Sequence, residues 1–108
     1  MAQPWPPPPD LASIRELVAT ADPEGFIADG APTDEYDHEA DQLQVNIVEL
    51  VTAELTVANL LLIIEPIWSE SFSLDAADLA RRRPSLTALA QQIERFFGPA
   101  ATPQVRSK

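Results

Sequence analysis

The sequence predicts an all-α fold, a small orthogonal or up-down bundle of four to five helices. Apolar residues recur at helical spacing through most of the chain, and no stretch shows the strict alternation of a half-buried strand. The length of 108 residues suits one compact domain. We therefore expect a single helical domain over residues 10–98. A proline-rich arm (1–9) would precede it, and a flexible tail (99–108) would follow.

The arm holds five prolines in nine residues. Proline fixes φ and donates no backbone hydrogen bond, so we expect an extended or disordered segment. Its Trp5 either belongs to a polyproline-type ligand or folds back onto the domain. The first helix starts after Asp10, whose carboxylate can cap free N–H groups. It ends before Pro23, because the residue before a proline is driven out of the helical region.

Residues 22–33 predict a structured loop rather than a linker. Asp22 to Gly25 suits a tight turn, because proline sets φ and glycine tolerates a positive φ. A second turn is expected at Asp29-Gly30. Between these turns, Phe26 and Ile27 supply two large apolar anchors.

Two longer helices are expected next. The first spans about 34–54, begins at Thr33 and alternates apolar residues in steps of four and three. The second follows Thr56 and is apolar on all sides from Val57 to Ile64, which is typical of a buried central helix. Pro66 should kink or break it, because proline cannot donate to the preceding turn.

The C-terminal third predicts a short helix over 75–82 and a last helix over 84–97, separated because Pro84 forbids continuation. Gly98 and Pro99 end the last helix. The run Arg81–Arg83 would then lie near a helix C-terminus, where the helix dipole favours cations. A nucleic-acid patch is the alternative for this run, but it lacks interleaved aromatic residues.

Composition excludes several classes of function. The chain has no cysteine, one histidine and three glycines, which removes thiol chemistry, disulfides and glycine-rich phosphate loops. The net charge is −10, and residues 1–80 hold all but one of the acids with Arg15 as their only base. Such a field repels nucleic acid and anionic membranes and favours a basic protein partner. Without a leader-like start or an apolar run of membrane-spanning length, we expect a cytoplasmic protein.

The densest polar cluster runs from Asp34 to Asp41. On a helix, Asp34, His38 and Asp41 share one face, and Glu35 with His38 forms a Glu-x-x-His element. This arrangement leaves open a metal-binding module or a metal-dependent enzyme. We favour helix capping with a solvated acidic face, and so assign no catalytic residue, cofactor or metal ligand.

The segments Asp22-Pro23-Glu24-Gly25, Pro32-Thr33-Asp34-Glu35-Tyr36-Asp37 and Ser71-Phe72 carry a resemblance. Over residues 20–73 the chain resembles a family of small bacterial all-helical proteins of unknown function with a DPxG…PxDEYDxE…SF pattern. The resemblance implies a small helical fold and transfers no catalytic residue.

The function we expect is that of a non-catalytic interaction protein, an immunity or antitoxin type of partner for a basic protein. A structural homodimer is the other alternative, because the helices are strongly apolar. The residues predicted to bind a partner are Asp29, Asp34, Glu35, Tyr36, Asp37, His38, Glu39 and Asp41.

Overall fold

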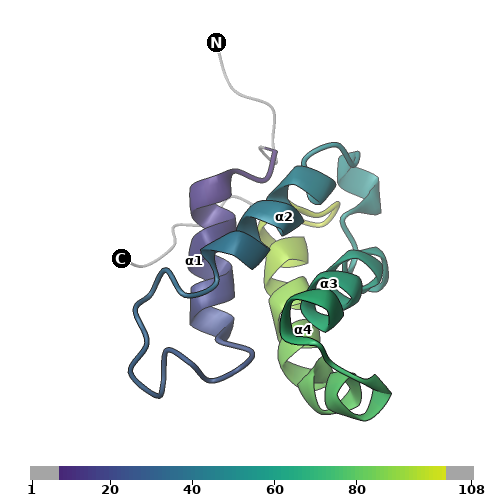
Figure 1. Cartoon of the computed structure of the whole chain (residues 1–108). Helices are drawn as coiled ribbons and strands as arrows, with labels where there is room; N and C mark the ends of the chain where they lie inside the picture. The colour runs from purple at the N-terminus through teal and green to yellow at the C-terminus, as the bar shows by residue number, and fades with distance from the viewer. Residues whose placement is uncertain (1–7, 102–108) are drawn as a thin grey trace.

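The computed structural model describes residues 8–101, and this part of the chain contains helices and no strand (Figure 1). The all-α prediction is confirmed. The predictions for residues 1–7 of the arm and 102–108 of the tail lie outside the described residues. The elements in order are α1 (Leu11–Ala21), α2 (Asp37–Ile47), the 3-10 helix η1 (Thr52–Glu54), α3 (Val57–Phe72) and α4 (Ala76–Phe97).

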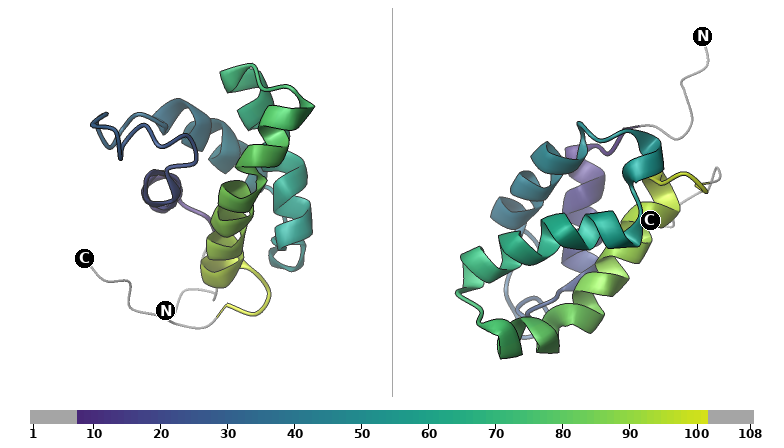
Figure 2. Two further views of the ribbon diagram at one scale, coloured as in Figure 1. Left: turned by 90° about the horizontal axis from the view of Figure 1, so that it is seen from below. Right: turned by 90° about the vertical axis from the view of Figure 1, so that its right-hand side faces the viewer.

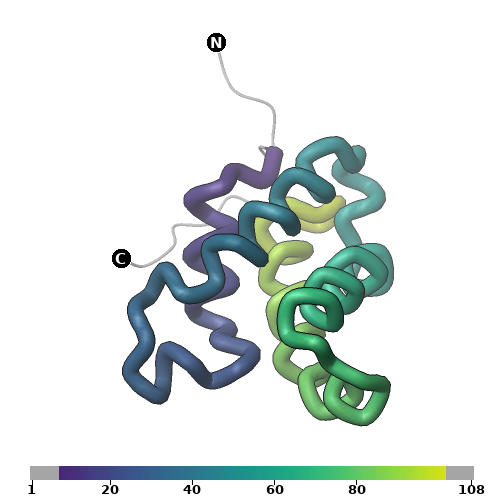
Figure 3. Tube along the Cα trace, viewed as in Figure 1, coloured from purple at the N-terminus to yellow at the C-terminus, as the bar shows by residue number. Residues whose placement is uncertain are grey.

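The four α-helices form a closed ring in which each packs against two neighbours, α1 on α2, α2 on α3, α3 on α4 and α4 on α1 (Figure 2). A short turn at 73–75 joins α3 to α4, which returns in the opposite direction. By contrast, α1 and α2 are joined by the long loop 22–36, which projects beyond the helices at one end (Figure 3).

The core lies inside this ring and draws on every α-helix. Trp68 and Tyr36 are its largest fully buried side chains. Burying an aliphatic side chain contributes about 1.5–3 kcal/mol, so this core drives folding. The buried hydrophobic residues are Ile14, Leu17, Val18, Tyr36, Ala40, Leu43, Ile47, Leu55, Leu60, Ile64, Trp68, Leu86, Leu89, Ala90, Ile93 and Phe97.

Local signals set the bounds of α1 as predicted. The Asp10 carboxylate accepts a hydrogen bond from the Ser13 amide at 2.9 Å and so caps the helix. The helix ends at Ala21, and Asp22 takes the left-handed conformation with φ 44°. Just before the helix, the buried Pro9 accepts a hydrogen bond at its carbonyl from Gln44 Nε2 at 3.1 Å, which ties the start of the domain to α2.

The prediction of one helix over 34–54 is wrong, because α2 covers only Asp37–Ile47. Its neighbour α1 also has 11 residues, so a longer α2 would extend past its packing partner. Instead the chain turns after Ile47 and passes through η1, which brings Leu55 into the core at 2% exposed. Tertiary packing here overrides a continuous apolar pattern.

The predicted break at Pro84 is also wrong, because α4 runs without interruption from Ala76 to Phe97. A proline inside a helix removes one hydrogen bond, here the one to the Ala80 carbonyl. Both Pro84 and Ala80 are exposed, so water can solvate that carbonyl. A break would separate Leu79 from Leu86, which pack into one core. Arg81–Arg83 therefore lie in the N-terminal half of a long helix and not near a C-terminus.

The helix α3 is less enclosed than its sequence predicts. Leu60, Ile64 and Trp68 are buried, but Leu62 on the opposite side is 74% exposed. Pro66 is exposed as well, and α3 continues through it to Phe72 without a break. None of the helices between residues 8 and 101 has both the length and the apolar content needed to cross a bilayer.

Replacing Pro84 by alanine should stabilise the protein. The new N–H can donate to the Ala80 carbonyl, and alanine is the best helix former. We expect the free energy of unfolding, measured in urea, to rise by about 1–3 kcal/mol. This range is net of the stabilisation that proline gives by restricting the unfolded chain. Ser85→Ala, at the next position, is the control and should change it by a few tenths. An unchanged or lower midpoint for Pro84→Ala would contradict this account of the helix.

Candidate interaction surface

All eight sequence-predicted site residues lie on the loop 22–36 or on the first half of α2, so the conformation of this loop decides where the charges stand. The loop starts with a turn in which the Gly25 amide donates to the Asp22 carbonyl at 2.9 Å. The Asp22 carboxylate then accepts hydrogen bonds from the amides of Ile27 at 3.1 Å and Ala28 at 2.9 Å. One side chain thus organises the first half of the loop.

Tyr36 completes this arrangement from the other end of the loop. Its hydroxyl donates to Asp22 Oδ1 at 2.6 Å and accepts from the amides of Glu24 at 3.0 Å and Phe26 at 3.4 Å. The phenol is only 2% exposed. Because a hydrogen bond to a charged acceptor is stronger than a neutral one, this contact firmly closes a loop that has no regular structure of its own.

An aromatic cluster fastens the closed loop to α3. The ring of Tyr36 stacks on Phe26 with centroids 5.9 Å apart and on Trp68 at 6.1 Å. Phe72 contacts Phe26 at 5.8 Å and Trp68 at 5.9 Å. Such pairs add about 0.5–1.5 kcal/mol beyond area burial. The loop is therefore a packed part of the domain, as the two apolar anchors predicted.

The pKa values of Tyr36 and Asp22 are both shifted by this environment. Burial raises the pKa of Tyr36 above its ordinary value of 10.0, and the hydrogen bond to Asp22 raises this pKa further. The same hydrogen bond is the largest cause that lowers the pKa of Asp22 below its ordinary value of 3.8, and the amides of Ala28 and Ile27 act in the same direction. The pair is thus held as a neutral phenol against a charged carboxylate.

The structure brings six of the eight predicted residues to the protein surface. Tyr36 and Glu39 do not belong there, because they are 2% and 7% exposed. These two are therefore not part of the exposed surface, and Tyr36 packs in the core. The remaining six form what we call the acidic surface: Asp29, Asp34, Glu35, Asp37, His38 and Asp41.

Arginine neutralises only one end of the acidic surface. On α1, Arg15 donates from Nε and Nη2 to the Asp41 carboxylate at 3.0 and 3.2 Å, and its Nε lies 3.7 Å from Asp37. The exposed carboxylates of Asp29, Asp34 and Glu35 form no ion pair with any described residue. These three are the members of the acidic surface that have no cation against them within residues 8–101.

The three consecutive arginines of α4, Arg81–Arg83, also form ion pairs with acidic residues of this chain. Arg82 contacts the nearly buried Glu24 at 2.8 Å and so ties the loop to α4, while Arg83 contacts Glu65 at 3.0 Å on α3. Arg81 pairs with Asp78 on its own helix. The three cations that could suggest a nucleic-acid patch are thus engaged in holding the fold together.

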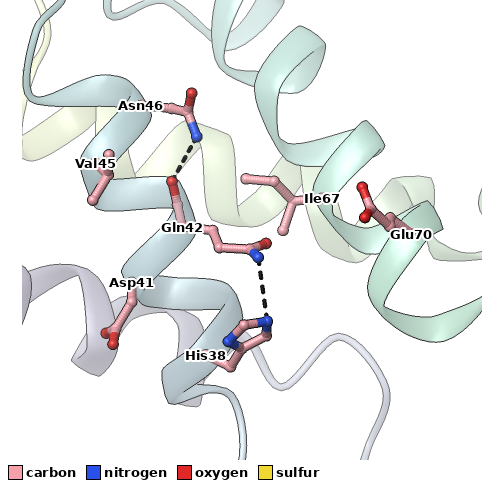
Figure 4. Close-up of a pocket in the computed structure, with 7 residues that line it drawn as sticks. All are labelled: His38, Asp41, Gln42, Val45, Asn46, Ile67 and Glu70. Atoms are coloured by element: carbon pink, nitrogen blue, oxygen red, sulfur yellow. Dashed lines mark hydrogen bonds between the residues drawn. The ribbon is translucent and has the colours of Figure 1, made fainter.

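An open pocket of about 550 Å³ lies beside the acidic surface, between α2 and α3. It follows α2 from His38 to Asn46, and we call it the α2–α3 groove. Ile67 projects from α3 toward Gln42 and Asn46 (Figure 4). The lining residues are His38, Asp41, Gln42, Val45, Asn46, Ile67 and Glu70.

Metal ligation finds no support in the geometry of residues 8–101, which hold no group of three or more histidine or acidic side chains placed to bind an ion. His38 Nε2 instead lies 3.2 Å from Gln42 Nε2, within hydrogen-bonding distance. Although Glu35 and His38 have the Glu-x-x-His spacing, the described part of the chain places no second pair of ligands against them. Metal-carboxylate bundles take their ligands from several helices, which is not the arrangement here.

Sequence reasoning missed the groove. Val45 is 63% exposed and lies away from the stripe formed by Ala40, Leu43 and Ile47. An apolar residue on the polar face of a predicted helix was the signal that could have marked it. The contribution of Ile67 could not be read locally, because it depends on how α3 packs on α2.

Comparisons with known proteins identify no family for this chain, so its class of protein is defined by the fold alone. No model of a protein family matches this chain. No curated protein and no solved structure matches it either. The resemblance to small bacterial helical proteins stays a prediction, and the fold defines a small all-α protein with an acidic surface.

The hydroxyl of Tyr36 should stabilise the loop measurably. In Tyr36→Phe the ring still fills the core, but the amides of Glu24 and Phe26 lose their acceptor and Asp22 loses a donor. We expect the free energy of unfolding to fall by about 1–3 kcal/mol. Hydrogen exchange should accelerate most at those two amides, with the Leu89 and Ile93 amides in α4 as the internal reference for global opening. Unchanged stability together with unchanged loop protection would contradict the role given to this hydroxyl.

Proposed function

We propose that this chain is a non-catalytic interaction protein whose acidic surface docks a basic protein partner. The carrying observation is the set of unpaired carboxylates of Asp29, Asp34 and Glu35 on a loop that is held in one conformation. In its more specific form, the proposal makes the chain an immunity or antitoxin type of partner that covers a basic protein. No catalytic group is assigned.

Charge distribution supports a basic partner. The described residues include all seventeen acids of the chain but only five of its seven bases. Four of those five, Arg15 and Arg81–Arg83, form ion pairs inside the fold. The excess charge that reaches solvent is therefore negative. A field of this kind speeds the encounter with a positively charged protein and suppresses encounters with acidic ones.

Rigidity supports docking by this surface in particular. The loop is fixed at Asp22 and Tyr36 by hydrogen bonds, at Glu24 by Arg82, and at Phe26 by aromatic packing. A surface that is ordered before binding loses less conformational entropy when it binds. An acidic tail without structure would have the same charge but not this advantage.

Reversing one charge in the acidic surface should abolish capture of the partner. We expect the immobilised protein to retain a basic protein from an extract of the cells that produce it, and salt to elute that protein, because screening weakens exposed charge pairs. The immobilised Glu35→Lys variant should no longer retain that protein. Glu49→Lys makes the same charge change at an exposed position outside the acidic surface and should keep it.

Two results would contradict this proposal. One is that no protein elutes with salt from the wild-type chain. The other is that Glu35→Lys and Glu49→Lys lose the same protein to the same extent, which would reduce the effect to net charge. Circular dichroism of both variants establishes that each retains its helices.

A further inference from the structure

We infer that the α2–α3 groove receives an amphipathic helix with basic flanks, supplied by the partner. This inference rests on the proposed function and names the partner's contacting element. The groove is continuous with the acidic surface, because His38 and Asp41 belong to both. A partner drawn to the acidic surface therefore meets the groove next.

The groove has two apolar side chains among its lining residues, Val45 on α2 and Ile67 on α3, with the polar Gln42 between them (Figure 4). Val45 on α2 is 63% exposed although it is a large apolar residue, and the half-buried Ile67 faces α2 from α3. Leaving such residues in water is unfavourable. Covering them with apolar side chains of a partner recovers this free energy.

Charge complementarity indicates which residues should stand beside the apolar face of the partner helix. The ionisable residues that line the groove are His38, Asp41 and Glu70, and no lysine or arginine is among them. Arg15 already pairs with Asp41, so Glu70 at the α3 border is the open carboxylate. A second copy of this chain, with its net charge of −10, would bring like charges together here. Lysine or arginine beside an apolar face is the complementary pattern.

The dimensions favour a helix over an extended strand. From His38 to Asn46, α2 rises about 12 Å, which matches roughly two turns of a partner helix with anchors at i, i+3 or i+4, and i+7. An extended peptide binds by adding to a sheet edge. Residues 8–101 contain no sheet, and the backbone groups within α2 and α3 are used in their own helices. Recognition must therefore occur through side chains.

The test uses three synthetic peptides of about fifteen residues. The amphipathic basic peptide is made of leucine and lysine, with leucine at positions i, i+3, i+4 and i+7. The second peptide has the same composition in scrambled order, and the third replaces each lysine of the first by glutamate. Binding to the full chain is measured by calorimetry, and the site by NMR shifts. We expect the amphipathic basic peptide to bind at least about tenfold more tightly than the other two. Its largest shifts should fall at Val45 and Ile67.

Val45→Lys and Val51→Lys form a matched pair of variants. The two valines are 63% and 61% exposed, and only Val45 lines the groove. Val45→Lys should weaken the amphipathic basic peptide about tenfold, because it places a cation where apolar contact is needed. Val51→Lys, which changes the net charge equally, should leave binding within about twofold.

Each other outcome overturns the inference. The inference is contradicted if the scrambled peptide binds equally well, if both variants weaken binding equally, or if no peptide binds. In each case the Glu35→Lys result still tests the acidic surface independently. A dimer that Val45→Lys dissociates and Val51→Lys does not, seen by light scattering, would assign the groove to a second copy. Conversely, groove binding with an unaffected Glu35→Lys would contradict the proposed function alone.

Discussion

The hydrogen bond between Tyr36 and Asp22 is the constraint on which the rest of the surface depends. Turns within the loop 22–36 satisfy part of its backbone. Four further amides, at Glu24, Phe26, Ile27 and Ala28, donate to these two side chains. Buried or half-buried amides without acceptors are costly. The pair removes that cost and at the same time fixes the distance between the two ends of the loop.

The charged residues take their places from this closure. Between the two anchored ends, the chain carries Asp29, Asp34 and Glu35 outward into solvent, and α2 begins directly after Tyr36. The arginines compensate acids elsewhere, at Asp41, Glu24 and Glu65. Within residues 8–101, Asp29, Asp34 and Glu35 stay without an ion pair, on a surface that adjoins the α2–α3 groove with its apolar Val45 and Ile67. Charge that steers a partner and apolar contact that retains it thus lie side by side.

The sequence predicted those features that local chemistry decides. The cap at Asp10, the end of α1 before Pro23 and the structured loop all rest on residues within a few positions of each other. The length of α2 and the unbroken α4 depend on packing between helices, so periodicity and proline rules misplaced their bounds. Arg15 with Asp41 and Arg82 with Glu24 are 26 and 58 residues apart, which no spacing rule could pair. Tyr36 is instructive, because it shares the apolar stripe with Ala40 and Leu43 and that pattern, rather than its acidic neighbours, determines its burial.

Titration of the phenol tests the central claim most directly, because the chain has one tyrosine. If Tyr36 is buried and donates to Asp22, tyrosinate absorbance should be absent around its ordinary pKa of 10.0 and develop only at higher pH. In Asp22→Asn the loss of the carboxylate should lower the pKa relative to the wild type, while burial still holds it above the ordinary value. A wild-type phenol that ionises at its ordinary pKa, with no change in Asp22→Asn, would contradict the closure of the loop described here.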